Sequence, residues 1–159
     1  MGKKKEQSAG GVRIVNRKAR HDYHITEVVE CGMALTGTEV KSLRAGQAKI
    51  DEAFARLRDG ELILVGSTIA LYPQAAAAMQ HEPNRDRKLL VHRRQIDQIL
   101  THVKQKGKTL VPLAVYFKHG WAKCEVGLAE GKRQYDKRQD LKERQVKRDI
   151  SREMERRRR

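Results

Sequence analysis

The chain has 159 residues, with 35 Lys and Arg against 20 Asp and Glu and a formal net charge of +15. This length predicts one domain with a proper core, and the positive excess predicts a polyanionic partner, nucleic acid first and an anionic membrane second. The apolar runs are too short for a membrane span and the start, MGKKKEQS, lacks a signal-peptide core, so we expect a cytoplasmic protein. Cys31 and Cys124 are too few for a disulfide framework and lack metal-ligand spacing, so both are expected to be buried thiols.

The positive charge is concentrated at the two ends of the chain. Residues 1–20 carry seven Lys and Arg and one acid, and residues 132–159 carry thirteen against six. Residues 21–131 carry fifteen against thirteen and are nearly neutral. The sequence therefore predicts a basic N-terminal arm (1–20), a folded domain (21–131) and a basic tail (132–159).

The first strong pattern in the domain is an alternation over residues 22–35, which predicts a strand. Such alternation is typical of an antiparallel sheet with one face in water. Glu27 breaks the apolar face. The expected members of that face are Tyr23, Ile25, Val29, Cys31, Met33 and Leu35.

A short helix is expected directly after this strand, with Thr38 as its N-cap. Val40 and Leu43 are three residues apart and should share the face that packs on the core. Lys41 and Ser42 should point away from it. Because Lys41 would then be the third helical residue, no capping box is expected.

Two hairpins are predicted from two-residue turns. Asp59-Gly60 should join strands at 53–58 and 61–69, and His119-Gly120 should join strands at 109–118 and 121–129. Pro112 lacks a backbone N–H and therefore indicates an edge or a bulge in its strand. In the second hairpin we expect Ala122, Cys124, Val126 and Leu128 to face inward, and Trp121, Lys123 and Glu125 to face outward.

The segment between these hairpins is expected to contain three pieces. Residues 72–84 predict a loop with a helical turn, and residues 88–92 predict a short strand. Apolar spacing over residues 96–103 predicts a helix, with Gly107 beyond its end. The fold class is therefore mainly β with two helices: a small antiparallel, oligonucleotide-binding-like β-barrel with a flexible basic tail.

The tail is too poor in apolar residues to offset its own ordering entropy. Val146, Ile150 and Met154 are four residues apart, so a helix would present one narrow apolar stripe. We therefore expect this segment to be disordered in the free protein and helical on a partner.

Four runs of residues, in this order, closely resemble the SmpB family. They are 16–23 (NRKARHDY), 37–44 (GTEVKSLR), 85–90 (RDRKLL) and 131–138 (GKRQYDKR). The members of this family are the bacterial SsrA-binding proteins, partners of transfer-messenger RNA in trans-translation. The sequence departs from the family pattern at Lys49, in the alanine-rich residues 75–78 and in the four final arginines.

The resemblance implies that the barrel binds the tRNA-like domain of transfer-messenger RNA at its elbow. It further implies that the complex enters a ribosome stalled on an mRNA without a stop codon, and that the tail becomes helical in the empty mRNA channel. The unfinished peptide is then tagged for proteolysis.

The resemblance also implies two sets of site residues. The RNA-binding set is Glu30, Leu90 and Lys123, with Asn16, Arg17, Arg20, Lys41, Arg44, Arg87 and Lys88 as companions. The ribosome-binding set is Gly131, Lys132, Arg133, Tyr135, Asp136, Lys137, Arg138, Val146, Ile150 and Met154. Lys and Arg would neutralise phosphates, while the Glu30 carboxylate would accept hydrogen bonds from exposed base edges or hold an Arg in place.

Simpler interpretations of single residues stay open at this point. Leu90 is by default a core residue, and Trp121 could serve hairpin packing as well as base stacking. Tyr135 in a basic linker has no core to join, which favours stacking on a base.

The residue inventory does not support an enzyme, a cofactor or a metal. The six histidines are scattered, and we find no phosphate-binding Gly-rich loop, nucleophile elbow or carboxylate pair. The main alternative is a ribosomal protein or translation factor with an RNA-binding barrel and basic arms. A membrane-surface protein is disfavoured because the apolar stripe of the tail is narrow. We expect a monomer.

Overall fold

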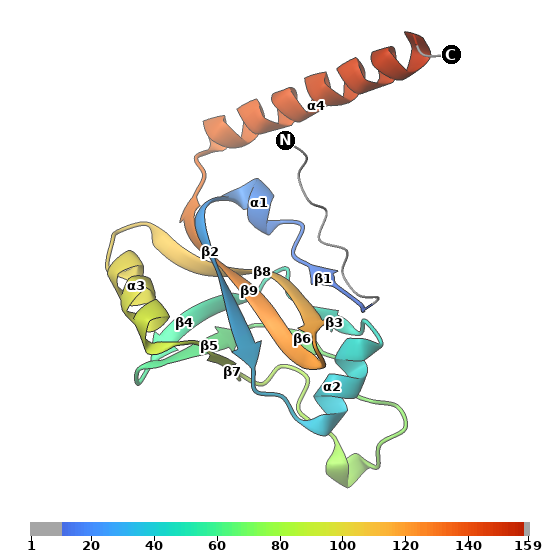
Figure 1. Ribbon diagram of the computed structural model, residues 1–159, viewed down its shortest axis with the longest axis vertical. Coiled ribbons are helices and arrows are strands. Elements are labelled where there is room, and N and C mark those ends of the chain that lie inside the picture. Colours follow the sequence, from blue (N-terminus) through green and yellow to red (C-terminus); the bar gives the residue numbers. More distant parts are fainter. Residues whose placement is uncertain (1–10, 158–159) are drawn as a thin grey trace.

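The computed structural model describes residues 11–157, apart from the side chains at positions 134, 135, 140, 144, 156 and 157. The N-terminal part is β1 (Ile14–Val15), α1 (Ala19–Asp22), β2 (Tyr23–Met33), α2 (Gly37–Arg44), β3 (Ala48–Lys49), β4 (Phe54–Arg58), β5 (Glu61–Val65) and β6 (Thr68–Ile69). The C-terminal part is η1 (Ala77–Met79), β7 (Arg87–Leu90), α3 (Arg93–Val103), β8 (Lys108–Lys118), β9 (Trp121–Gly131) and α4 (Gln134–Arg157). Figure 1 shows a β body with α3 at one side, α2 below and α4 extending from the top.

The main sheet closes into a barrel. Within the described chain its strands follow the order β1-β8-β4-β5-β7-β2-β9, and β9 also pairs with β8. All of these pairings are antiparallel. β3 and β6 form a separate pair. The predicted antiparallel barrel is confirmed, and closure leaves few unpaired strand edges.

The main core fills the barrel with apolar side chains from its strands. Cys31, Leu62, Leu64, Cys124 and Val126 have no measurable exposure there. Leu43 of α2 and Ile99 of α3 pack into the same cluster. The two short helices thus complete the core that the strands begin.

A second, smaller core lies under α1, and a bulge in β2 explains why one strand serves both cores. The register of β2 against β9 shifts between Ile25 and Glu27. Ile25 and Tyr23 consequently pack on the small core with Ala19, whereas Val29 and Cys31 face the barrel interior. The prediction of one apolar face along the strand was wrong, because the extra residue reverses the alternation.

Both predicted hairpins are present. Asp59 and His119 have φ of 53° and 50°, and the glycines after them have φ of 76° and 81°. Positive φ at both central residues is the geometry of a type I′ turn, which Asp-Gly favours. The expected irregularity at Pro112 is also confirmed, because the β8–β9 register shifts between Pro112 and Ala114.

The helix α2 differs from its prediction at the N-terminus. Thr36, not Thr38, is the N-cap, and the first helical bond runs from the Val40 N–H to the Thr36 carbonyl. Glu39 is therefore the third helical residue, and its carboxylate accepts a hydrogen bond from the Thr36 N–H at 2.8 Å. This bond belongs to a capping box. Ser42, predicted to point away from the core, is buried.

The tail contains the longest helix of the described chain. α4 runs from Gln134 to Arg157 and extends away from the barrel just after the end of β9 (Figure 1). Its apolar side chains, Leu141, Val146, Ile150 and Met154, are all exposed. The expectation that the free tail is disordered is untested by this structure and stays a prediction.

Candidate nucleic-acid interface

The barrel brings Glu30, Lys123 and Leu90 onto one outer face. Gly32 of β2 pairs with Lys123 of β9 on one side and with Leu90 of β7 on the other. Glu30 lies two residues before Gly32 on the same strand and therefore faces the same side. Residues from β2, β7 and β9, which are far apart in sequence, thus lie within two neighbouring pairs of the sheet.

Leu90 is exposed on this face, with 51% of its surface accessible. Gly32, its cross-strand partner, leaves room beside it. A Cβ added at Gly32 would lie 3.2 Å from the Leu90 Cβ. The default interpretation of Leu90 as a core residue is therefore wrong, and an apolar side chain stands free beside charged ones.

Glu30 is the centre of a polar network on this face. The Tyr116 hydroxyl donates to Glu30 Oε2 at 2.6 Å, and Lys118 Nζ lies 3.2 Å from the same oxygen. Lys123 Nζ lies 3.9 Å from Oε1. The hydrogen bond from Tyr116, reinforced by Lys118 and Lys123, holds the pKa of the Glu30 carboxyl below its ordinary value. The carboxylate is therefore ionised and can only accept hydrogen bonds.

The first described residues of the chain support Tyr116 from its other side. The Arg13 guanidinium lies 4.7 Å from the centroid of the Tyr116 ring. Arg13 also forms an ion pair with Glu125 at 2.7 Å. We name the set Glu30, Tyr116, Lys118, Lys123 and Leu90 the barrel face.

The basic residues of α2 stand at one rim of the barrel. Arg44 lies over the ring of Phe117, the neighbour of Tyr116 on β8, at 5.2 Å. Lys41 lies over the ring of Tyr72 at 5.1 Å. Both cations are exposed, and Arg44 stands near the end of β8. Their expected contacts with phosphates stay a prediction. Lys88 of β7 is also exposed and forms an ion pair with Glu61.

Two residues of the expected RNA-binding set are buried. Asn16 is 3% exposed, and its side chain donates to the Ile50 and Pro112 carbonyls and accepts from the Ala19 N–H. Arg87 is 0% exposed. Neither side chain is accessible to an RNA, so their expected direct contacts are corrected to structural roles.

Arg87 is part of a buried ionic cluster. Its Nε donates to Glu39 Oε1 at 3.0 Å, and its other donors reach the carbonyls of Ser67, Pro83 and Arg85. Arg85 donates to both oxygens of Glu39, at 2.8 and 2.5 Å. The cluster joins α2, the segment after β5 and the start of β7, and so fixes the α2 rim relative to Leu90.

Arg20 lies beside the start of the tail, at Lys132, and Arg17 is exposed just before α1. Lys132 Nζ donates to the Arg20 carbonyl at 3.0 Å, and the Lys132 N–H donates to the Asp22 carbonyl at 2.9 Å. Lys137 forms an ion pair with Asp22 at 3.1 Å. Hydrogen bonding to His21 and the nearby Lys137 lower the pKa of Asp22. The structure thus places α1 beside the expected ribosome-binding residues.

The expected ribosome-binding linker begins where the barrel ends. Gly131 is the last residue of β9 and pairs with Tyr23. The Arg133 N–H donates to Asp136 Oδ2 at 3.3 Å, within the first turn of α4. Arg133 and Arg138 are exposed. The side chain of Tyr135 lies outside the described residues, so its expected stacking role stays a prediction.

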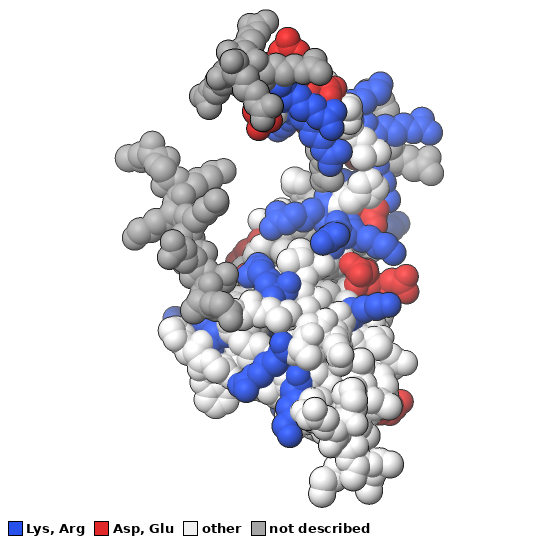
Figure 2. Space-filling model, turned by 90° about the vertical axis from the view of Figure 1, so that its right-hand side faces the viewer, with Lys and Arg blue, Asp and Glu red and all other residues white. Residues whose placement is uncertain are grey.

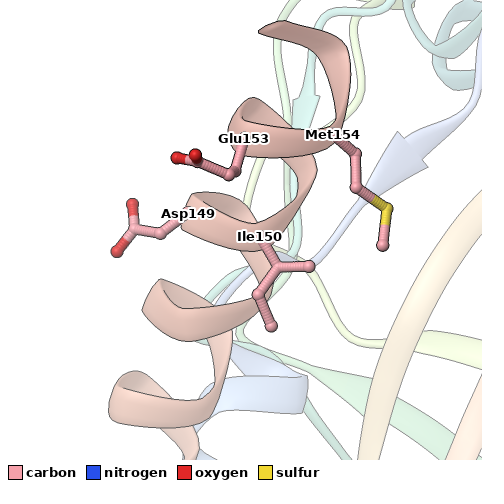
Figure 3. A pocket seen from close by; sticks show the side chains of 4 residues that line it. All are labelled: Asp149, Ile150, Glu153 and Met154. Carbon is pink, nitrogen blue, oxygen red and sulfur yellow. The ribbon is translucent and has the colours of Figure 1, made fainter. Parts of the chain in front are cut away.

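The apolar stripe of the tail is present on α4. Figure 3 shows Ile150 and Met154 directed to one side of the helix, and Asp149 and Glu153 directed away from them. Ile150 is 49% exposed and Met154 is 63% exposed. The helix therefore carries unpartnered apolar side chains of the kind that dock in a groove.

Positive side chains extend down the side of the molecule that Figure 2 presents. Lys and Arg appear from α4 at the top to the lower body, and the lowest part of this view is largely uncharged.

In the described residues, 11–157, no group of three or more His, Cys, Asp or Glu could hold a metal ion. None of the described helices is both long and apolar enough to span a membrane.

Sequence analysis did not single out Tyr116, Lys118, Arg13 or Gly32. The sequence does contain a signal that places Tyr116 and Lys118 near Lys123. The two-residue His119-Gly120 turn sets Lys118 opposite Trp121 and Tyr116 opposite Lys123, so Tyr116 follows from Lys123 by counting. Trp121, at the same turn, is 74% exposed, and its role in hairpin packing or base stacking stays open.

Comparison with known proteins agrees with this geometry. The family model described as SmpB protein matches residues 13–156. An SsrA-binding protein of Salinispora tropica is 56% identical over 137 residues, which are 86% of this chain and 86% of the relative. One of Thermobifida fusca is 48% identical over 161 residues, covering 99% of this chain and 100% of the relative.

A solved structure supports the same assignment. One chain of the structure described as "tmRNA-SmpB: a journey to the center of the bacterial ribosome" is 48% identical to this chain. It superposes with a TM-score of 0.65, over 81% of this chain and 94% of that chain. On its sequence and its fold, the chain is a member of the SmpB protein family.

Proposed function

We propose that this protein binds the tRNA-like domain of transfer-messenger RNA and accompanies it to stalled ribosomes in trans-translation. The observation that carries the proposal is the barrel face, where an ionised Glu30, two lysines and an exposed Leu90 stand together. Lysines neutralise phosphates, a carboxylate selects N–H donors of base edges, and an apolar side chain packs against a base or sugar. The protein acts by binding rather than by catalysis, as a monomer in the cytoplasm.

The tail supplies the second half of the proposed function. The exposed stripe of Val146, Ile150 and Met154 would contact the empty mRNA channel of the ribosome. The basic residues at the start of the tail, from Lys132 to Arg138, would lie near the decoding centre. Arg17 and Arg20 stay expected contacts of transfer-messenger RNA. In this division residues 1–20 are an arm, 21–131 the RNA-binding barrel and 132–159 a tail that becomes ordered on the ribosome.

The RNA-binding half is tested by titrating the protein with transfer-messenger RNA, ordinary tRNA and an unrelated hairpin. We expect clear preference for transfer-messenger RNA and a marked loss of that preference in Glu30→Ala. Glu27→Ala is the matched control, because Glu27 is exposed on the same strand but alternates to the other face. Equal binding of wild type and Glu30→Ala in moderate salt would show that the barrel face is not the RNA site.

The tail is tested by truncation after Arg138. The truncated protein should still bind transfer-messenger RNA but should fail to support peptide tagging in a translation extract. A full-length variant with Val146, Ile150 and Met154 replaced by serine should behave in the same way. Loss of RNA binding together with tagging would contradict the division into barrel and tail.

A further inference from the structure

The Glu30 carboxylate is held by its neighbours in one orientation. Oε2 receives the short hydrogen bond from the Tyr116 hydroxyl and the longer one from Lys118. Oε1 has more distant neighbours, with Lys118 Nζ at 3.4 Å and Lys123 Nζ at 3.9 Å. A carboxylate oxygen offers two lone pairs, so Oε1 keeps acceptor capacity for an incoming group.

Tyr116 is itself held in place from two sides. It lies opposite Lys123 in the β8–β9 ladder, and the Arg13 guanidinium covers its ring. Arg13 is fixed in turn by its ion pair with Glu125, which is the cross-strand partner of Glu30. The hydroxyl therefore sits on a braced ring rather than on a free side chain.

We propose that Tyr116 is a positioning residue for RNA recognition, which holds Glu30 so that Oε1 faces an N–H donor of an exposed base. The inference rests on the proposed function. A lysine next to a carboxylate competes for it. Without Tyr116 the carboxylate would turn further towards Lys118 and Lys123 and tighten the ion pairs that it already forms with them at 3.2 and 3.9 Å. Those ion pairs would occupy both the acceptor and the cations that a phosphate needs.

The hydrogen bond also keeps the carboxylate in its accepting form. It is the largest cause of the lowered pKa of Glu30. On the Tyr116 side, burial and then acceptance by Glu30 raise the pKa of the phenol, so the hydroxyl stays a donor across the neutral range. Donor and acceptor roles at this bond are therefore fixed.

The test is a double-mutant cycle on affinity for transfer-messenger RNA in low salt, where phosphate contacts keep weak binding measurable. Tyr116→Phe removes the hydroxyl and keeps the ring beneath Arg13. We expect an affinity loss of about tenfold in the wild-type background, the size expected for a hydrogen bond to a charged group. In the Glu30→Ala background the same substitution should change the affinity by less than about twofold, because nothing remains to be positioned.

Tyr72→Phe is the matched control. The Tyr72 hydroxyl donates to Gln74 in an exposed loop, and its ring, like that of Tyr116, lies under a cation. This variant should bind like wild type. The pKa of Glu30, followed by carboxyl NMR, should rise in Tyr116→Phe and stay unchanged in Tyr72→Phe.

Four outcomes would overturn the proposal. An unchanged affinity or an unchanged Glu30 pKa in Tyr116→Phe would show that the bond does not matter in solution. An equal loss with and without Glu30 would show that the hydroxyl contacts RNA by itself. A wild-type protein without preference for transfer-messenger RNA over the hairpin would overturn the proposed function and the positioning role together, whereas selective binding with additive losses would overturn the positioning role alone.

Discussion

The buried ionic cluster of Glu39, Arg85 and Arg87 predicts a large stability loss when its single anion is removed. Glu39 and Arg87 have 0% exposed side chains, and Glu39 faces both guanidinium groups within 3.0 Å. In Glu39→Gln the volume is kept but Arg87 becomes a buried, uncompensated cation. Breaking one partner of a buried pair costs about 3–5 kcal/mol. The Thr36 N–H would also lose its charged acceptor.

The loss can be measured by urea denaturation and by thermal unfolding. For a domain of this size, about 3–5 kcal/mol corresponds to a fall in Tm of about 6–20 °C. Glu61→Gln is the control, because it removes an exposed carboxylate paired with Lys88 and should cost less than about 1 kcal/mol. A loss below about 1 kcal/mol in Glu39→Gln would refute the reasoning, since the cluster would then tolerate a buried unpaired charge.

The same pair of proteins predicts a pH dependence. Burial penalises the charged form of Glu39, but the hydrogen bonds from Arg85 and the Thr36 N–H and the charge of Arg87 outweigh it, so its pKa lies below the ordinary 4.5. A carboxyl with a lowered folded-state pKa stabilises the fold above its unfolded-state pKa, and this contribution is lost as the pH falls. The stability difference between wild type and Glu39→Gln should therefore be full at neutral pH and shrink below pH 4.5. A difference that grows on acidification would contradict this assignment.

Three further predictions concern the barrel face, the α2 rim and the thiols. Leu90→Ser should change the unfolding free energy by less than about 1 kcal/mol, because the side chain is half exposed, while RNA affinity falls severalfold in a binding titration. A loss of stability as large as the loss of binding free energy would assign Leu90 to the core instead. Lys41→Gln combined with Arg44→Gln should flatten the plot of log affinity against log salt by about 1.4–1.8, and an unchanged slope would mean that neither cation meets a phosphate. Burial raises the pKa of Cys31 to about 12 and also raises that of Cys124, so iodoacetamide should label both thiols at neutral pH only after unfolding, as mass spectrometry can show.

Much of the barrel could be predicted because its local signals are strong. Asp59-Gly60 and His119-Gly120 define turns that need positive φ at two successive positions, and they fix the register of the strands beside them. Pro112 signalled a real bulge. The alternation of β2 failed as a guide at Thr26, because a bulge without proline or glycine leaves no mark in the sequence other than the misplaced Glu27.

The candidate site was predictable only in part, because the burial of a residue depends on partners that are distant in the sequence. The family resemblance indicated Glu30, Leu90 and Lys123, and strand pairing brings them together. Asn16 and Arg87 were misassigned because a polar residue in a basic motif looks like a nucleic-acid contact. Their burial is set by distant partners such as Pro112 and Glu39, which local patterns do not reveal.

The single strand β2 links both ends of the proposed machinery. Tyr23 stands beside the start of the tail and Glu30 stands on the barrel face. Their partners on β9, Gly131 and Glu125, are six residues apart, which is roughly 20 Å at the rise of an extended strand. The strand thus sets a fixed distance between the face where an RNA would bind and the point where α4 leaves the barrel. Adding or removing one residue within it would not merely shift this spacing, because it would also turn one of the two attachment points to the wrong side of the sheet.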